Sequence, residues 1–435
     1  MKRLLDTEVR YFDQDSFNIP KLENRWGCMV DFLDHTLVHN GAEIGINFIK
    51  TTEEVDYWVC SIETSMPHSL KSLLSVIDIS GSEELTYNNT FRVQEVLSPN
   101  TFTIAFSKES LPLKPPDISQ ENMFLKISSL GFEKTHSEYQ KAVYKTTTKK
   151  DLECFLRVDN SCPEGHDPSW AKFSRVSMFS EIDTIDDYEF RLDRTKAPAI
   201  SSNYVKSEES SEEVWINCRQ SVSSNYFYKD RTENADLPEF FIIGTKNTFY
   251  IFLRAVLITS PYTDVIYTFG EYNKLMYKED TLPFLLKTSS ESPAGRYLTG
   301  SEFEDLFRQS SSGKHTFTSD ISDNFTSTNS VKWSLFFNES YLSGITTDIN
   351  YRTYKNELVL NLFPAYIKIH RPGRTLLEGI LKGVSLIMAD MRDTPEYSLD
   401  HLQTFLHEGR HYLTVRSRDR NQSDLKVLIH LNDWE

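Results

Sequence analysis

Between Glu43 and Phe106, turn-forming residues divide the chain into short segments rich in β-branched and aromatic side chains. Pieces such as Met66-Pro67-His68-Ser69 and Ser98-Pro99-Asn100 interrupt the sequence at intervals of roughly eight to twelve residues. The segments between them are Ile44–Ile49, Val55–Glu63, Leu73–Ile79, Thr90–Val96 and Thr101–Phe106. This pattern is typical of a small antiparallel barrel or sandwich. We expect the proline-containing residues 107–120 to form the linker that leaves this unit.

A second group of strands is predicted within the stretch from Gly131 to Asp187. A hydrophilic lead-in precedes three short apolar segments that are separated by polar turns. The predicted strands are Ala142–Lys145, Cys154–Asp159 and Ala171–Phe179. Short strands in this order indicate an antiparallel meander. We interpret Arg157, Asp159 and Asn160 as turn and strand-edge residues of this meander.

The clearest helical pattern lies near the N-terminus. Asn24 has the character of an N-cap, and Asn40-Gly41 ends the helical pattern. Apolar residues recur at spacings of three and four: Trp26, Met29, Val30, Leu33, Leu37 and Val38. An amphipathic helix that packs on a sheet is expected. His35 and His39 are four residues apart, but their apolar neighbours favour the polar edge of this helix over a metal pair. Residues 1–20 are predicted to be a frayed terminus or an arm that docks elsewhere.

Further strands are predicted along the rest of the chain. They are a strand headed by Trp215, a hairpin over Phe241–Tyr250, and strands at Leu253–Ile258, Val265–Phe269, Val331–Phe337, Glu357–Phe363 and Tyr366–His370. Polar residues in Ala197–Glu213 and Thr288–Ser330 predict loops. With 435 residues the chain is too long for one core. We predict a mainly β protein of several small antiparallel barrel or sandwich domains with one N-terminal amphipathic helix. The predicted domains are residues 1–128, 129–287 and 288–435.

The charge and cysteine content limit the possible functions. The chain has 47 Lys and Arg against 63 Asp and Glu, a formal net charge of −16, which disfavours direct binding of nucleic acid. Five scattered cysteines without a C-x-x-C pair predict reduced thiols rather than disulfides or a zinc knuckle. The N-terminus lacks the apolar core of a signal peptide, and no apolar stretch is long enough to span a bilayer, so we expect neither secretory export nor membrane insertion.

Two sequence patterns were weighed as metal sites. His407-Glu408-Gly409-Arg410-His411 matches H-E-x-x-H, which binds zinc when a helix presents both imidazoles on one face. Here Gly409 and the alternating segment after it favour a turn that opens a strand. Glu181, Asp183, Asp186 and Asp187 form an acidic cluster without the spacing of a calcium loop, so a solvated loop is expected. We therefore predict no metal, cofactor or catalytic residues.

Several segments resemble structural proteins of tailed-phage virions. In the first unit, Tyr87-Asn88-Asn89 and Asn100-Thr101-Phe102-Thr103 match a turn and a strand start of a β-barrel module of that family. Four further matches occur in the family's order: Gly131-Phe132-Glu133-Lys134, Ala142-Val143-Tyr144, Leu156–Asn160 and Ser174-Arg175-Val176. Later matches are Trp215, Phe241–Tyr250, Gly373-Arg374, Leu376, Leu377, Gly379, Leu381, Gly383 and Gly409–Leu413. The family's turn glycine is replaced by Asn89, and its Gly-Asp-Gly turn by Gly244-Thr245-Lys246-Asn247.

The resemblance implies a non-enzymatic structural subunit of the virion. We expect a homo-oligomeric ring or sheath in the tail that contacts other tail or portal proteins and is assembled in the host cytoplasm. A tail sheath or tube-surrounding protein is favoured, including the non-contractile sheath of a short-tailed phage. One alternative is a receptor- or glycan-binding tail accessory that uses loop aromatics such as Tyr226–Tyr228. A third hypothesis is a zinc hydrolase based on His407–His411.

Overall fold

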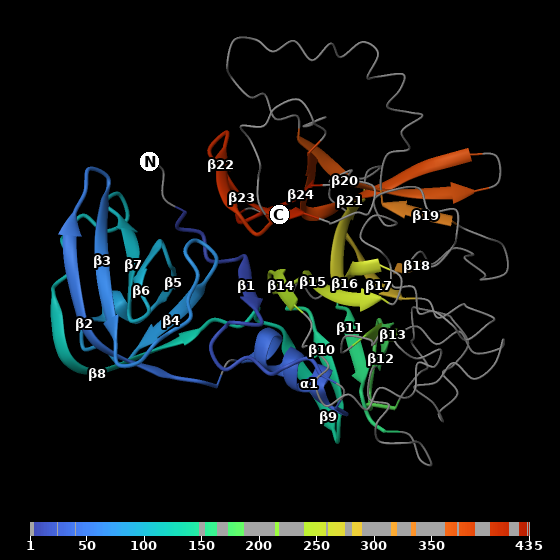
Figure 1. The fold of residues 1–435 in the computed structure, drawn as a ribbon, viewed down its shortest axis with the longest axis horizontal. Coiled ribbons are helices and arrows are strands. Elements are labelled where there is room, and N and C mark those ends of the chain that lie inside the picture. Colours follow the sequence, from blue (N-terminus) through green and yellow to red (C-terminus); the bar gives the residue numbers. More distant parts are fainter. Residues whose placement is uncertain are drawn as a thin grey trace, which may run out of the picture.

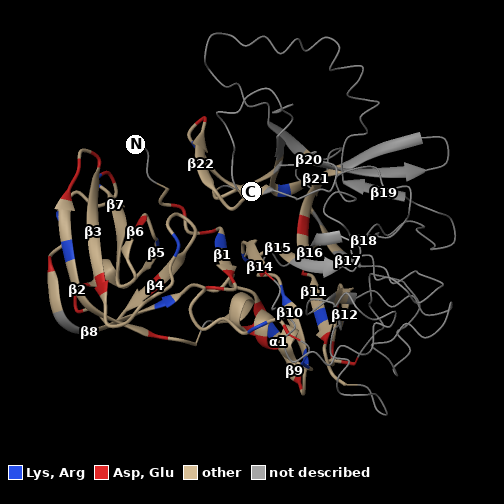
Figure 2. Ribbon diagram, in the orientation of Figure 1, with Lys and Arg blue, Asp and Glu red and all other residues tan. Residues whose placement is uncertain are grey.

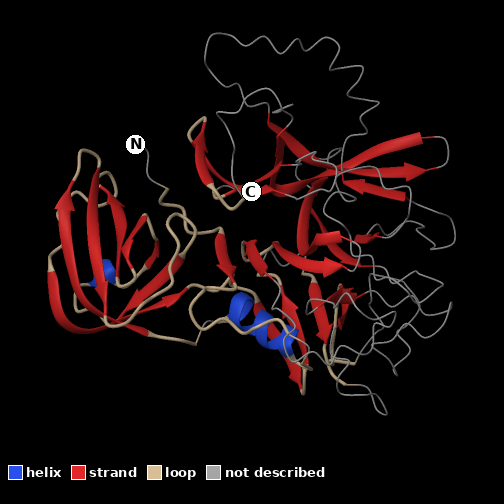
Figure 3. Cartoon of the chain, viewed as in Figure 1, coloured by secondary structure: helices blue, strands red, loops and turns tan. Residues whose placement is uncertain are grey.

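The computed structural model shows a mainly β protein, as predicted (Figure 1). It describes residues 4–23, 25–39, 41–147, 153–162, 173–186, 214–216, 239–257, 260–274, 281–288, 315–319, 332–335, 362–371, 374–387, 401–416, 426–432 and 434. Antiparallel strands dominate these residues, and helices are short (Figure 3). The predicted loop at Ala197–Glu213 and the aromatic residues Tyr226–Tyr228 lie outside the described residues.

The N-terminal unit is a seven-stranded antiparallel sheet in the order β5-β4-β8-β2-β3-β7-β6. Its strands are β2 (Ile44–Glu53), β3 (Tyr57–Thr64), β4 (Val76–Ser80), β5 (Thr90–Arg92), β6 (Glu95–Ser98), β7 (Thr101–Ser107) and β8 (Ile118–Ile127). β5, at one edge of the sheet, pairs with β4. β6 begins only two residues after the end of β5, but it pairs with β7 and forms the opposite edge. The segment from Thr90 to Ser98 therefore bridges the two edges and curls the sheet. We call this unit the half-barrel.

Strand β8 corrects the predicted exit linker at residues 107–120. It begins at Ile118, directly after the prolines, and lies between β2 and β4 in the middle of the sheet. Met123, Leu125 and Ile127 are buried in the half-barrel core. The polar run Ser119-Gln120-Glu121-Asn122 hid this strand from pattern analysis, because it does not alternate as a half-buried strand does.

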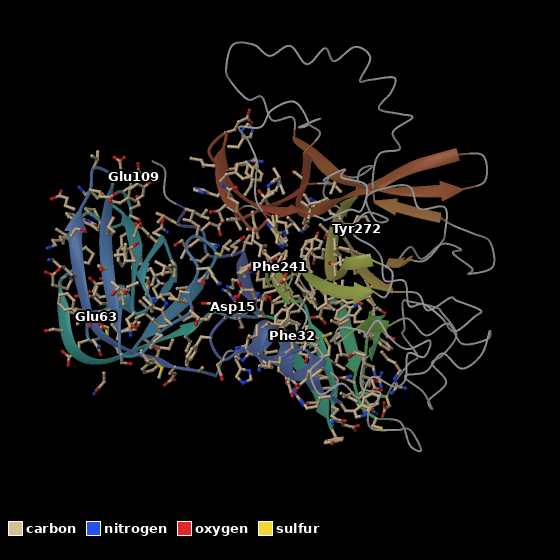
Figure 4. All side chains as sticks on the ribbon, viewed as in Figure 1. Asp15, Phe32, Glu63, Glu109, Phe241 and Tyr272 are labelled. Atoms are coloured by element: carbon tan, nitrogen blue, oxygen red, sulfur yellow. The ribbon has the colours of Figure 1, made fainter. Side chains whose placement is uncertain are left out.

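The N-terminal helix is present but shorter than predicted. α1 spans Cys28–Leu33 and continues as a π-helix, η1, over Asp34–Val38. Its N-cap is Gly27, with φ of 84°, and Asn24 lies outside the described residues. The apolar face packs on a sheet as expected: Phe32 meets Phe240 edge to face at 5.1 Å (Figure 4). His35 is only 8% exposed, so the prediction that it lies on the polar edge of the helix is wrong.

The predicted meander forms the first layer of a sandwich. This layer consists of β9 (Glu133–Glu138), β10 (Lys141–Lys145), β11 (Phe155–Asp159), β12 (Phe173–Phe179) and β13 (Val214–Ile216), each paired antiparallel with the next. β9 was missed, because its polar sequence was interpreted as a hydrophilic lead-in. It is a polar strand at the edge of the layer. Among the described residues, β9 pairs only with β10.

The second, central layer contains the predicted hairpin. Its strands are β1 (Arg10–Asp13), β14 (Glu239–Gly244), β15 (Phe249–Leu257), β16 (Ser260–Lys274) and β17 (Thr281–Thr288). The layers join where Val214 of β13 pairs with Thr288 of β17. β18 (His315–Ser319) pairs with β17, so part of the predicted loop at Thr288–Ser330 is a strand.

Both faces of the central layer are buried. Phe240 and Ile242 point into the core shared with the first layer, whereas Phe241 and Ile243 point into a second core. The second core is completed by a C-terminal layer, and Phe241 and Tyr272 lie at this contact (Figure 4). Burial on both sides explains why β14 and β15 are continuous apolar runs instead of alternating strands.

The C-terminal layer consists of two strand groups that meet at one long strand. Its strands are β19 (Lys332–Leu335), β20 (Leu362–Arg371), β21 (Arg374–Ile387), β22 (Thr404–His407), β23 (Arg410–Arg416) and β24 (Lys426–His430). β21 pairs with β20, with β24 and with β16 of the central layer. The two strands predicted at Glu357–Phe363 and Tyr366–His370 belong, over their described residues, to the single strand β20, which bulges after Pro364. The two predicted domain boundaries remain a prediction, although β1 pairs across the first and β18 across the second.

Candidate functional site

The segment His407–His411 is a β-hairpin. His407 ends β22, Arg410 begins β23, and these two residues are paired. Glu408 and Gly409 form the two-residue turn with φ of 48° and 77°. Positive φ at both central positions defines a type I′ turn, whose twist matches that of paired strands. The strand-opening turn predicted at Gly409-Arg410 is therefore confirmed.

This hairpin does not have the geometry that the zinc hypothesis requires. His411 lies opposite Leu406, so the pleat places His407 and His411 on opposite faces of the hairpin. His411 is 7% exposed, whereas the Glu408 side chain is 84% exposed at the tip. The two imidazoles cannot share one ion with Glu408 beside them. Across the described residues, no group of three or more His, Cys, Asp and Glu side chains is placed to hold a metal.

A buried cluster of charges lies on the outer face of the first layer. Asp159 of β11 accepts hydrogen bonds from Arg175 Nη2 at 2.7 Å and from Arg157 Nη2 at 3.2 Å. Its other carboxylate oxygen accepts from the hydroxyl of Ser161 at 2.6 Å and from the Ser161 amide at 3.0 Å. Arg157 and Asp159 are each 2% exposed. Arg157 lies in the middle of β11, which is paired on both sides, so its prediction as a turn or strand-edge residue is wrong. Asp159 is the last residue of β11, as predicted, but it is buried.

The charges of this cluster determine the protonation of its acid. Burial alone would raise the pKa of Asp159, but the guanidinium groups of Arg175 and Arg157 and the bonds from Ser161 outweigh it. The pKa of Asp159 is consequently below its usual value, and the residue is an anion at neutral pH. Two arginines thus surround one buried carboxylate, and the cluster stays charged through the neutral range.

The same cluster fixes the acidic loop that follows β12. Arg157 donates to the carbonyl of Ile185 and, at 2.8 Å, to Asp186, which also accepts from Lys141 at 2.9 Å. Ile182 and Ile185 are buried beneath the loop. Glu181 and Asp183 are exposed, as predicted for a solvated loop, but Asp186 is part of an ion-pair network. Asp187 lies outside the described residues.

Asn160 connects the first layer to the helix. Its side-chain oxygen accepts from the amide of Met29 at 3.2 Å, and its carbonyl accepts from the amide of Gly27 at 3.0 Å. Both amides belong to the start of α1, where main-chain donors lack partners within the helix. The side chain predicted as an ordinary turn residue is a tertiary cap for α1.

Further buried charges were missed by sequence analysis. Arg92 is 2% exposed, and Glu271 on β16, 3% exposed, pairs with Lys382 on β21 at 3.1 Å. Each occupies a polar position in an alternating strand, which usually faces water. The pattern contains no signal that another layer covers that face.

Most of the large apolar side chains that are exposed among the described residues lie on the half-barrel. A groove of about 410 Å³ is lined by Pro67, His68, Ser69, Leu70, Val96, Leu97, Ser98 and Pro99. At the other end of β3 and β7, Val55 is 89% and Leu113 80% exposed. Acidic residues are frequent around the loops of this unit (Figure 2).

Comparison of the chain with known protein families, with curated proteins and with solved structures found no match. Among the described residues, none of the helices has the length and apolar character needed to cross a bilayer. Cys28, Cys60 and Cys154 are buried and Cys162 is half-buried, and none of the four forms a disulfide, as predicted. Cys218 lies outside the described residues.

Proposed function

We propose that this protein is a structural subunit of a phage virion that forms an oligomeric ring or sheath in the tail. The observation that carries the proposal is where the residues of the family resemblance lie. Tyr144 is fully buried and its hydroxyl donates to Asp34 at 2.9 Å, Trp215 is fully buried, and Asp159 joins two arginines. The signature residues thus stabilise the fold itself, which is the task of a scaffold.

A second observation concerns the surface of the half-barrel. Trp58 Nε1 donates to the carbonyl of Leu111, and the amide of Lys108 donates to Asp56, so the β2–β3 turn and the loop after β7 share one end. Val55 and Leu113 project from these two loops. Single exposed apolar residues are common on monomers. In a ring, the neighbouring copy would cover both side chains, and a small contact repeated around the ring gives a stable assembly.

The net charge supports an outer position in the tail. At −16, the subunit repels the phosphates of a DNA-filled channel, whereas a layer around a tube has no such conflict. The proposed partners are copies of this chain and neighbouring tail or portal proteins.

Mass photometry and negative-stain electron microscopy of the purified full-length chain test this proposal. We expect closed rings, and we expect Val55→Asp combined with Leu113→Asp to weaken them by roughly tenfold or more in dissociation constant. Tyr139→Asp, an equally exposed site on the first layer, is the matched control. A monomer that adheres to host cells would favour the receptor-binding alternative. Stoichiometric zinc that is lost in His407→Ala would favour the hydrolase.

A further inference from the structure

The N-terminal residues 4–13 run from the half-barrel to the central layer (Figure 1). Arg10–Asp13, which is β1, pairs antiparallel with β14, from Arg10 opposite Gly244 to Asp13 opposite Phe241. The strands of the half-barrel pair only with one another over the described residues. No shared strand pairing therefore fixes its orientation on the sandwich.

On the half-barrel side, two buried side chains bind the main chain of this segment. Arg92 donates to the carbonyls of Asp6 at 2.6 Å and Val9 at 2.5 Å, and Gln94 donates to the carbonyl of Leu4 at 2.7 Å. Arg92 also donates to the carbonyls of Leu73 and Leu74 in its own unit. Burial lowers the pKa of Arg92 to about 10, so the guanidinium remains charged at neutral pH.

On the sandwich side, the same segment is part of the second core. Leu4, Val9 and Tyr11 belong to the cluster that contains Phe241 of β14 and, from the half-barrel, Leu74. The rings of Tyr11 and Phe241 stack at 5.7 Å. Lys71 of the half-barrel adds an ion pair with Asp13 at 3.4 Å. Residues 4–13 are thus bound on both sides by different kinds of interaction.

We propose that residues 4–13 are a strap that fixes the half-barrel at one angle to the sandwich. When the strap is released, both parts stay folded and the half-barrel turns about the chain connections near residues 39–43 and 128–132. The acceptors on the strap are main-chain carbonyls, so Arg92 and Gln94 bind its backbone rather than its side chains. This inference does not rest on the proposed function.

Spin-label distance measurements on the full chain test the strap. Labels replace Leu85 on the half-barrel and Tyr139 on the first layer, because these side chains are 80% and 82% exposed and neither belongs to the proposed subunit contact. Cys162→Ser and Cys218→Ser leave only the buried thiols of Cys28, Cys60 and Cys154 beside the labelled positions. We expect a narrow distance distribution in the parent protein and one about twofold wider, or shifted, in Arg92→Met, as hinge motion predicts.

The control is Arg25→Met, because Arg25 is a surface arginine that pairs with Glu23 and Asp31 beside it. It should leave the distribution unchanged. Arg92→Met also removes donors inside the half-barrel, so far-UV circular dichroism must show that the variant is folded. A second variant, which lacks residues 2–9, removes the part of the strap that Arg92 and Gln94 bind and keeps both side chains. An unchanged distribution in either folded variant would overturn the proposal.

Discussion

Asp159 compensates two buried guanidinium groups, and its removal would leave both without their shared anion. Removing one partner of a buried ion pair typically costs about 3–5 kcal/mol, so we expect a loss of that size in Asp159→Ala. Urea denaturation monitored by circular dichroism measures it. Asp183→Ala, at an exposed position of the following loop, should change stability by less than about 0.5 kcal/mol. Equal effects of the two substitutions would contradict the role of the cluster.

His35 makes stability depend on pH. Burial, the nearby His39 and a weaker opposing bond to the main chain of Phe17 together lower the pKa of His35 to about 4. Nε2 is buried without a hydrogen-bond partner, and the ring lies edge-on to Phe12 at 6.4 Å. Below the unfolded pKa of about 6.5, the unfolded chain binds a proton that the folded chain excludes.

The free energy of unfolding should therefore fall as the pH decreases from about 6.5 towards 4. We expect a loss of roughly 1–2 kcal/mol from this residue, after a discount for partial access of water. His35→Phe keeps an apolar ring beside Phe12 and should remove this part of the pH dependence. His68 is a second buried histidine with a lowered pKa, and it should still contribute in that variant. A pH profile that His35→Phe leaves unchanged would refute the assignment.

At the scale of elements, substitutions at two adjacent positions of the β22–β23 hairpin should change its stability in opposite directions. A type I′ turn favours Asn followed by Gly, so Glu408→Asn should stabilise the chain by a few tenths of a kcal/mol to about 1 kcal/mol. Gly409→Ala should destabilise it by about 1 kcal/mol, because a residue with a Cβ is strained at a φ of 77°. No steric clash adds to this cost, since the added Cβ would meet no atom within 4 Å. Thermal unfolding measures both changes. A zinc hydrolase would instead lose its activity in Glu408→Asn, because the glutamate of H-E-x-x-H is the general base.

Helix α1 shows how an element depends on distant residues. It has six residues, and a helix of that length is not stable alone. Asn160 caps its start, and the hydroxyl of Tyr144, which donates to Asp34, lies 3.2 Å from the carbonyl oxygen of Val30. The three- and four-residue spacing of apolar side chains predicted the helix and its buried face. Its start at Gly27 and its change to a π-helix were not predictable, because both depend on contacts with the first layer.

At the scale of the whole molecule, the chain end joins two layers. Trp434 is 3% exposed, packs at 5.6 Å on Tyr250 of β15 and donates to the carbonyl of His430 at 2.7 Å. Its indole also lies against Gly383 of β21, where an added Cβ would collide with the ring. A residue at the end of the sequence is thus part of the second core.

Trp434→Ala should cost about 3–5 kcal/mol, as expected for a large buried aromatic ring. Gly383→Ala should be strongly destabilising in the parent protein and less so in Trp434→Ala, because the second change removes the collision. A double-mutant cycle from chemical denaturation provides the test. Additive effects would show that the two residues do not share this contact.

The sequence alone determined the local structure of this protein. Alternation and turn residues located most strands of the half-barrel, the meander of the first layer and the two hairpins, because these signals depend on neighbouring residues. The turn that opens a strand at Gly409 was predicted for the same reason, and this prediction disfavoured a zinc-binding helix.

Only the tertiary structure decided which polar residues are buried. Alternation along a strand distinguishes its two faces, but it does not show whether a loop or another layer covers the outer one. Arg157, Asp159, Arg92 and Glu271 all occupy such outer positions and are all covered. Each has distant main-chain or side-chain groups as partners at its buried position. Such partners come together only when the chain folds, so no pattern of neighbouring residues could identify them.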